Sequence, residues 1–339
     1  MCTGNNCNMM AEETLHPVDH AMSGGSHGRL ARAYYHLKPY LPLGIRWAIR
    51  RYRIPAILRR NAGTWPILES AAVKPQGWNG WPHGKSFALV LTHDVESAAG
   101  VGKTRQLAEL EIQHGFRSSF NFIPESHYPD PVEIRAWLVS NGFEVGVHDL
   151  RHDGHLYESR EAFSRNAKSI NRYLHEWNAA GFRSGFMLRQ LDWLHDLDVQ
   201  YDASTFDTDP FEPQPEGSRT IFPFHVKAPP GVRRPGYVEL PYTLPQDSTL
   251  FLLLRERNTG IWKRKLDWIA ANGGLALVNI HPDYLDFSNN RFSNEAYPST
   301  LLSEFMSYIR ENHEGAYWNP LARDLAAWYR GTLPDDHMA

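Results

Sequence analysis

Short apolar segments alternate with helical patterns along most of this 339-residue chain, and this alternation limits the folds open to it. The segments 87–93 (FALVLTH), 143–148 (FEVGVH) and 275–281 (LALVNIH) are nearly continuous hydrophobic runs, which is typical of strands covered on both faces. Helical patterns lie between such segments, for example over 101–115 and 161–181, each of which ends in glycine. Strands that alternate with helices pair in parallel, and about seven strands favour an α/β barrel-like closure over an open sheet.

Composition excludes several classes of protein. The 35 Lys and Arg residues against 38 Asp and Glu residues give a net charge of −3, so we expect no nucleic-acid partner. No apolar run approaches the ~18 residues of a membrane span, and no secretory leader is visible. Cys2 and Cys7 lie in a polar segment, which excludes a disulfide framework and a cysteine zinc site. We therefore expect a cytoplasmic protein whose metal, if it binds one, is held by carboxylates and some of the 17 histidines.

The chain divides into three parts by composition. Residues 1–28 are polar and aperiodic, and we expect them to be a disordered tail. Residues 29–85 form a basic N-terminal extension, of which 29–60 carries nine Lys and Arg residues and no acidic residue. Two interpretations remain open: this arm makes peripheral contact with an anionic membrane, or it docks on the acidic remainder of the chain. Residues 86–330 hold the alternating strands and helices and form the barrel domain.

Titratable residues follow three of the predicted strands, at the edge where parallel α/β folds gather their reactive groups. Asp94 follows the first strand. It is a candidate metal ligand or general base, and the alternative is that it only caps the N-terminus of the next helix. His148 and His152 are four residues apart, so both imidazoles can turn towards one ion; the alternative is a pair of loop histidines. His281 ends the last strand and is a candidate general acid, because imidazole titrates near neutral pH, or a hydrogen-bonded histidine at the edge of the core.

An arginine and an acidic segment complete the candidate residues. Arg183, in the segment GFRSG, is expected to pair with one of the acids, in a functional or a purely structural ion pair. Asp207 and Asp209 are candidates to orient and charge-pair with a catalytic imidazole, and the alternative is that they only form turns.

A nucleotide hydrolase is a minor alternative. The segment 97–104 contains Gly-Lys-Thr between a strand and a helix, as a phosphate-cradling loop does. Ser97, however, stands where that loop needs a glycine for its tight turn. We therefore expect Lys103 to be a solvated residue in the first turn of a helix.

Five segments, in this order, resemble the motifs of the polysaccharide deacetylases, carbohydrate esterase family 4: THDV, HDLRH, RSGF, FDTDP and NIH. The resemblance covers residues 86–285 and implies a distorted (β/α)7 barrel that removes acetyl groups from N-acetylated sugars. It also implies a role for each candidate: Asp94 as the catalytic base, His148 and His152 as metal ligands, Arg183 as the residue that braces the base, His281 as the catalytic acid, and Asp209 or Asp207 as the aspartate that tunes this acid.

Two positions depart from the pattern of that family. The metal-binding aspartate that follows the base is Val95 here, and Gly185 stands where the third motif usually has proline. We expect Asp94 to become the third ligand of a divalent ion, Zn²⁺ or a similar one, beside the two histidines. Glu96 is expected to reach the site only if the chain turns after the strand.

The sequence therefore predicts a metal-dependent hydrolase that acts on an N-acetylated sugar of a polysaccharide or glycolipid precursor. The predicted catalytic residues are Asp94, His281, Arg183 and Asp209. The predicted metal ligands are Asp94, His148 and His152. The alternatives are a metal-independent amidohydrolase and a non-catalytic glycan-binding protein of the same fold, which the missing carboxylate at Val95 suggests.

Overall fold

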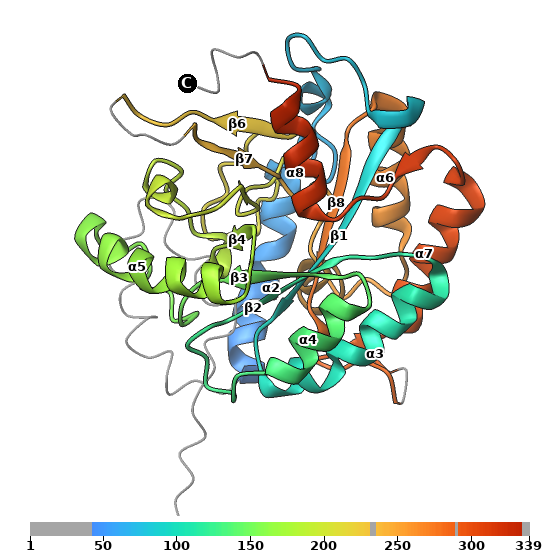
Figure 1. Ribbon diagram of the computed structural model, residues 1–339. Helices are drawn as coiled ribbons and strands as arrows, with labels where there is room; N and C mark the ends of the chain where they lie inside the picture. The colour runs from blue at the N-terminus through green and yellow to red at the C-terminus, as the bar shows by residue number, and fades with distance from the viewer. Residues whose placement is uncertain (1–42, 231–234, 289–290, 334–339) are drawn as a thin grey trace, which may run out of the picture.

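The computed structural model describes residues 43–230, 235–288 and 291–333. A curled, mostly parallel sheet forms its centre, and helices surround the sheet (Figure 1). The strands that build the curl are β1 (Phe87–Val95), β2 (Ser119–Phe122), β3 (Glu144–His148), β4 (Gly181–Arg183), β5 (Tyr201–Asp202), β7 (Tyr237–Glu239) and β8 (Leu275–Ile280). Shorter strands are β6 (Phe224–Val226), β9 (Leu285–Asp286), β10 (Tyr297–Pro298) and β11 (Tyr317–Trp318).

The strand order confirms the predicted distorted (β/α) barrel. Neighbours pair in parallel along the path β8–β1–β2–β3–β4–β5–β7, and β6 adds an antiparallel edge to β7. A parallel bridge between Leu244 and Val278 brings the chain after β7 back to β8. All nine residues of β1 are buried, as its continuous apolar sequence predicts for a strand covered on both faces. The carboxyl ends of these strands therefore converge at one end of the curl.

Of the two helices expected to end in glycine, the first does so at Gly115, whereas the helix expected over 161–181 ends at Glu176, and Gly181 is the first residue of β4. The longer helices are α2 (Leu43–Arg60), α3 (Ala98–His114), α4 (Val132–Ser140), α5 (Arg160–Glu176), α6 (Gly260–Asn272), α7 (Thr300–His313) and α8 (Ala322–Gly331). The side chain of Ser97 accepts a hydrogen bond from the Gly100 amide at the start of α3, and Gly115 ends this helix with φ 79°. Helix α5 buries one stripe, formed by Phe163, Ala167, Ile170 and Leu174.

Short helical turns connect these elements: η3 (Glu69–Ala72), η4 (Pro82–Gly84), η5 (Gly185–Met187), η6 (Trp193–Asp196), η7 (Ser248–Leu253) and η8 (Pro282–Tyr284). Five of them are 3-10 turns, whereas η7 is a π-helical segment. π-Helical turns, which are wider than α-helical turns, are often found beside functional sites. Here η7 lines the pocket described below.

The described part of the basic extension lies on the body of the protein. Ile54, Ile57 and Leu58 of α2 pack against the main core, and the Arg51 guanidinium donates to the Leu252 carbonyl over 3.0 Å. These contacts support docking for this half of the arm. The tail 1–28 and residues 29–42 lie outside the described residues, and membrane contact by 29–60 stays a prediction.

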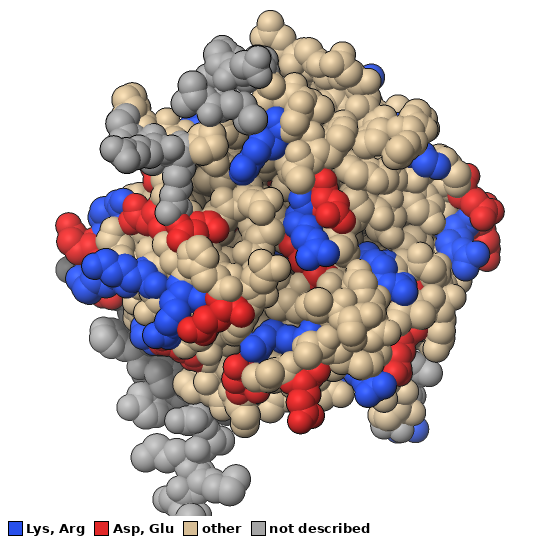
Figure 2. All heavy atoms as spheres, in the orientation of Figure 1, with Lys and Arg blue, Asp and Glu red and all other residues tan. Residues whose placement is uncertain are grey.

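The surface has mixed charge. On the face shown in Figure 2, basic and acidic side chains are interspersed, as expected from the small net charge of the chain. Among the described residues, none of the helices is both long enough and apolar enough to cross a membrane.

Candidate active site

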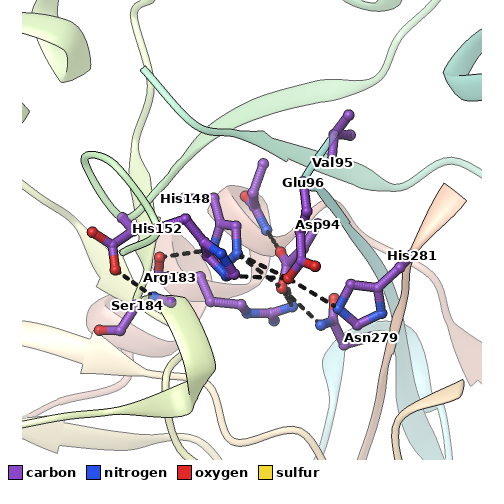
Figure 3. A network of polar contacts seen from close by, with 12 residues as sticks. Asp94, Val95, Glu96, His148, His152, Arg183, Ser184, Asn279 and His281 are labelled. Carbon is purple, nitrogen blue, oxygen red and sulfur yellow. Dashed lines mark hydrogen bonds and ion pairs between the residues drawn. The ribbon is translucent and has the colours of Figure 1, made fainter. Parts of the chain in front are cut away.

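The predicted site residues come together at the carboxyl ends of the strands (Figure 3). Asp94 lies on β1, His148 ends β3 and Arg183 ends β4, while His152 and His281 follow β3 and β8. The parallel register aligns these ends, because His148 pairs with Arg183 across the sheet. All five side chains are buried. The sequence therefore placed these residues at one site correctly.

The two neighbouring histidines are arranged as ligands. His148 Nδ1 lies 3.1 Å from the Arg183 carbonyl, to which it donates, so Nε2 carries a lone pair. The rings of His148 and His152 are 4.8 Å apart between centroids, and the Nε2 atoms of both are buried without a hydrogen-bond partner. An unpartnered buried nitrogen is costly in a folded protein. Two such atoms side by side fit a divalent cation.

A carboxylate that the sequence analysis did not select completes this group. Glu96 Oε1 lies 3.2 Å from His152 Nε2 and 3.6 Å from His148 Nε2. The potential ligand atoms of the three residues lie within 4.8 Å of one another. Asp94 Oδ2, the predicted third ligand, is farther away, 4.0 Å from His148 Nε2. The structure thus favours Glu96 over Asp94 as the ligand that joins the histidines.

The expectation that Glu96 needs a turn to enter the site is wrong. Residues two apart on an extended chain point to the same side, so Glu96 follows Asp94 into the site. Val95, between them, points the other way, and its side chain is fully buried in the main core. A carboxylate therefore enters the site from the position after the one where the family pattern has its metal-binding aspartate.

Asp94 is held by donors on several sides. Its two oxygens accept hydrogen bonds from Asn121 and Asn279 over 2.9 and 2.7 Å, and Arg183 Nη1 lies 3.5 Å from each oxygen. Burial alone would raise the pKa of Asp94, but the charges of Arg183 and of the nearby imidazoles lower it well below its usual range. Asp94 is therefore ionised, and the expected pairing with Arg183 is confirmed.

His281 is paired with an aspartate that the sequence did not indicate. Its Nδ1 lies 2.7 Å from Asp247 Oδ1, and its backbone amide donates to Asp247 Oδ2 over 2.9 Å. The Tyr297 hydroxyl donates to the same Oδ2 over 3.0 Å. Burial opposes the charged imidazole, yet Asp247 and Glu96 outweigh it and raise the pKa of His281 to about 10. His281 is therefore an imidazolium at neutral pH.

Solved structures with this arrangement of strands are known. No family model matches the sequence, and no curated protein matches it significantly. A crystal structure from Mycobacterium smegmatis, assigned provisionally as a polysaccharide deacetylase, has 16% identity, covers 76% of this chain and 95% of its own, and superposes with a TM-score of 0.58. The Puue allantoinase has 16% identity, covers 75% and 93%, and has a TM-score of 0.56. The chain has the polysaccharide deacetylase fold.

Within this deacetylase fold, the prediction for Asp209 and Asp207 is wrong. Asp209 Oδ2 lies 3.0 Å from the Tyr242 hydroxyl, and Asp207 forms a buried ion pair with Lys265 at 2.9 Å. The imidazole partner is Asp247, which precedes η7. Asp207 and Asp209 stand out in the sequence as part of one acidic segment, whereas the contact with His281 depends on where η7 packs.

The second departure from the deacetylase pattern, Gly185, also has a physical cause. The Gly185 amide donates to Asp149 Oδ2 over 3.0 Å, and proline has no such donor. A Cβ atom at this position would lie 2.5 Å from Asp149 Oδ2 and 2.8 Å from His152 Cδ2. Asp149, His152, Phe186 and Met187 all have positive φ, between 52° and 57°. Such a concentration of strained backbone is typical of a functional site.

The nucleotide-binding alternative does not fit the structure. Asp283 covers the start of α3, where its carboxylate accepts hydrogen bonds from the Glu96 amide and the Ser97 hydroxyl over 3.1 and 2.5 Å. Lys103 donates to the Asp283 carbonyl over 2.7 Å. An acidic side chain occupies the place that a phosphate would need, so this helix start cannot act as a phosphate cradle.

Proposed function

We propose that this protein is a divergent polysaccharide deacetylase, a metal-dependent hydrolase that removes the acetyl group from an N-acetylated sugar. One observation carries the proposal: two buried imidazoles with unpartnered Nε2 atoms face the same carboxylate, beside a third imidazole that is protonated. The resemblance of the sequence motifs and the shared fold support it. Substrate, metal and bond type are part of the proposal.

Glu96, His148 and His152 would hold the ion, and their nitrogen and oxygen atoms suit Zn²⁺ or a similar metal. When bound, a divalent ion supplies a Lewis acid that polarises the acyl carbonyl and lowers the pKa of water to about 7. Asp94 is therefore not needed as a ligand. Its low pKa makes it a poor proton acceptor, so its first task is to accept a hydrogen bond from the attacking water and orient it.

His281 provides the proton that the reaction needs. The Asp247 carboxylate holds Nδ1, which leaves Nε2 to face the pocket, where Glu96 Oε1 lies 3.7 Å away. From Nε2 the imidazolium donates its proton to the leaving nitrogen, because an amine leaves far more easily than its anion. Asp247 stabilises the charged ring and fixes its orientation, as the aspartate of a catalytic triad does.

The second candidate is the metal-independent amidohydrolase that the sequence analysis left open; an allantoinase is among the solved structures of similar fold. The two candidates differ in what satisfies the Nε2 atoms of His148 and His152. In the metal-dependent enzyme an ion does so, whereas without metal both atoms face only Glu96 Oε1, at 3.6 and 3.2 Å, and neither forms a hydrogen bond to it. The unpartnered atoms therefore favour the metal-dependent enzyme.

Metal analysis and acetate release test the proposal together. Purified protein should carry about one equivalent of a divalent metal by elemental analysis, release acetate from N-acetylated sugar oligomers, and lose activity to a chelator. Glu96→Gln should weaken the metal affinity by at least about a hundredfold, while Glu158→Gln, at a surface position, should not change it. Activity that persists without metal would establish the amidohydrolase instead. Metal binding without acetate release from any such oligomer would indicate a non-catalytic glycan-binding protein.

A further inference from the structure

Glu96, the proposed metal ligand, lies in a short junction of the chain. Its side chain lines the pocket at the active site, together with Asp94, His148 and His281. Strand β1 ends one residue before Glu96, and only Ser97 separates it from α3. A glutamate also has one more rotatable bond than an aspartate, and fixing each such bond costs conformational entropy. A ligand in this place therefore needs restraints from the side chains around it.

The peptide group between Val95 and Glu96 is held at both ends. The Tyr128 hydroxyl, from the loop after β2, donates to the Val95 carbonyl over 2.9 Å and accepts from the Ile123 amide over 3.1 Å. The Glu96 amide donates to Asp283 Oδ2 over 3.1 Å. Because the carbonyl and the amide of a trans peptide point in opposite directions, these two contacts fix the plane of the group.

Asp283 is itself fixed by the start of α3. Its Oδ1 accepts a hydrogen bond from the Ser97 hydroxyl over 2.5 Å, and its backbone carbonyl accepts one from Lys103 Nζ over 2.7 Å. A Cβ atom at Gly100 would overlap the Asp283 carboxylate, so a residue without a side chain leaves room for it there. The loop after β8 is therefore docked closely on the junction that carries Glu96.

Tyr284 holds the Glu96 carboxylate itself. Its hydroxyl donates to Glu96 Oε2 over 3.3 Å, and its ring packs against the His281 ring with the centroids 5.1 Å apart. The other oxygen, Oε1, lies 3.2 Å from His152 Nε2 and 3.6 Å from His148 Nε2. One oxygen is thus held by the protein, and the other faces the nitrogen atoms that would share the ion.

We propose that Tyr128, Asp283 and Tyr284 are positioning residues for the metal: they fix Glu96 so that its Oε1 stays beside the two histidines. This inference rests on the proposed function, of which it uses the metal site. The three residues act on the ion through Glu96 and take no part in bond cleavage. Residues that hold a metal ligand in place typically change the metal affinity by about 10–100-fold, so the loss of one hydroxyl should be measurable.

Calorimetric titration of the full-length, metal-free protein with Zn²⁺ tests the inference. Tyr128→Phe and Tyr284→Phe each remove one hydroxyl and should each weaken Zn²⁺ binding by about tenfold or more. Tyr308→Phe is the matched control. Its hydroxyl also donates to a carboxylate, that of Asp267, but at an exposed place on α7, so its loss should leave the affinity unchanged.

The same substitutions in a Glu96→Ala background separate positioning from a purely structural role. Without the carboxylate the hydroxyls have nothing to position, so Tyr128→Phe and Tyr284→Phe should then change the affinity by less than about twofold. A loss as large as in the wild-type background overturns the inference. If Glu96→Ala binds Zn²⁺ too weakly to titrate, Cu²⁺ replaces it in every variant, because Cu²⁺ binds such sites most tightly.

The possible results separate the inference from the proposed function. A wild-type protein that binds no Zn²⁺ overturns the metal-dependent function and the inference together. Zn²⁺ binding that neither Tyr128→Phe nor Tyr284→Phe weakens overturns the inference alone. Zn²⁺ binding without acetate release from N-acetylated sugar oligomers overturns the function, and the titrations still decide the inference. If one of the two variants does not fold, the other carries the test.

Discussion

At the scale of single residues, the two groups that flank the reacting position are held in opposite charge states. Asp94 stays ionised because Arg183 and two asparagines donate to it or lie beside it. His281 stays protonated because Asp247 holds its ring. At neutral pH the site thus holds a carboxylate and an imidazolium, and in the reaction proposed above the first would orient the water and the second would protonate the leaving nitrogen.

Asp247→Asn should shift the pH dependence of the reaction. The acid form of His281 is populated below its pKa, which Asp247, with Glu96 and Asp94, raises to about 10 against burial, so loss of the Asp247 charge lowers this pKa. The alkaline limb of kcat/KM should move to lower pH by at least about one unit, and kcat at neutral pH should fall at least tenfold because the ring also loses the carboxylate that orients it. Rate measurements between about pH 6 and 10 would check this.

A surface pair provides the control for Asp247→Asn. Asp267 lies 2.9 Å from His313 on α7, away from the pocket, so Asp267→Asn should leave the profile unchanged. If the alkaline limb stays in place in Asp247→Asn, His281 is not the proton donor.

At the scale of elements, the loops after β3 and β4 are fitted to each other through backbone contacts. The Gly185 amide after β4 binds the Asp149 carboxylate after β3, and the His152 ring lies against the same glycine. The His152 ring also packs against the Phe186 ring, with the centroids 4.3 Å apart and the planes tilted by 33°. The position of His152, a predicted metal ligand, therefore depends on the absence of a side chain at Gly185.

Gly185→Ala should displace His152. The new Cβ atom would lie 2.8 Å from the imidazole, so the ring or the loop must move. The expected results are a metal affinity lower by about 10–100-fold and a destabilisation of about 1–3 kcal/mol. Calorimetric metal titration and urea denaturation would measure them. Gly102→Ala in α3 is the control, because a Cβ atom there meets nothing within 4 Å, and its stability should not fall.

At the scale of the whole molecule, the N-terminal extension supports the pocket. Helix α2 contacts η7, the segment that follows Asp247 and lines the pocket with Ser248, Thr249 and Leu253. The packing of Ile54, Ile57 and Leu58 on the core holds α2 in place. A segment some 190 residues away in sequence thus supports the element that positions His281's partner.

Ile57→Asp should therefore reduce both stability and activity. A charge on the packed face of α2 has no partner and should cost about 2–4 kcal/mol. Because α2 supports η7, kcat/KM should fall as well. Tyr52→Asp, at a position that is 88% exposed on the same helix, should change neither quantity. Normal activity in a destabilised Ile57→Asp protein would show that α2 stabilises the fold without supporting the pocket.

The prediction that the basic arm contacts a membrane can be tested directly. If residues 29–60 contact an anionic surface, the protein should sediment with phosphatidylserine vesicles at low salt and less at about 0.3 M salt. Replacement of the exposed Arg59 and Arg60 by glutamine should weaken this binding. Equal sedimentation with neutral vesicles would rule out an electrostatic contact.

The sequence predicted some parts of the site and not others, for identifiable reasons. β1 and β8 were predictable because their buried apolar runs are continuous, and His148, His152 and Arg183 because they directly end or follow strands. The contact of Asp247 with His281 joins residues 34 positions apart through the packing of η7, and no local pattern signals it.

The place of Glu96 has a consequence for how related chains are interpreted. A residue-by-residue comparison of this sequence with the family motif finds Val95 in place of the metal-binding aspartate and suggests an inactive protein. Residues at alternate positions of an extended chain face the same side, however, so Asp94 and Glu96 both point into the site, and Glu96 lies with His148 and His152 in a group that could hold a metal. Homologous chains set aside as inactive for want of adjacent aspartates should be checked for an acid one place further on.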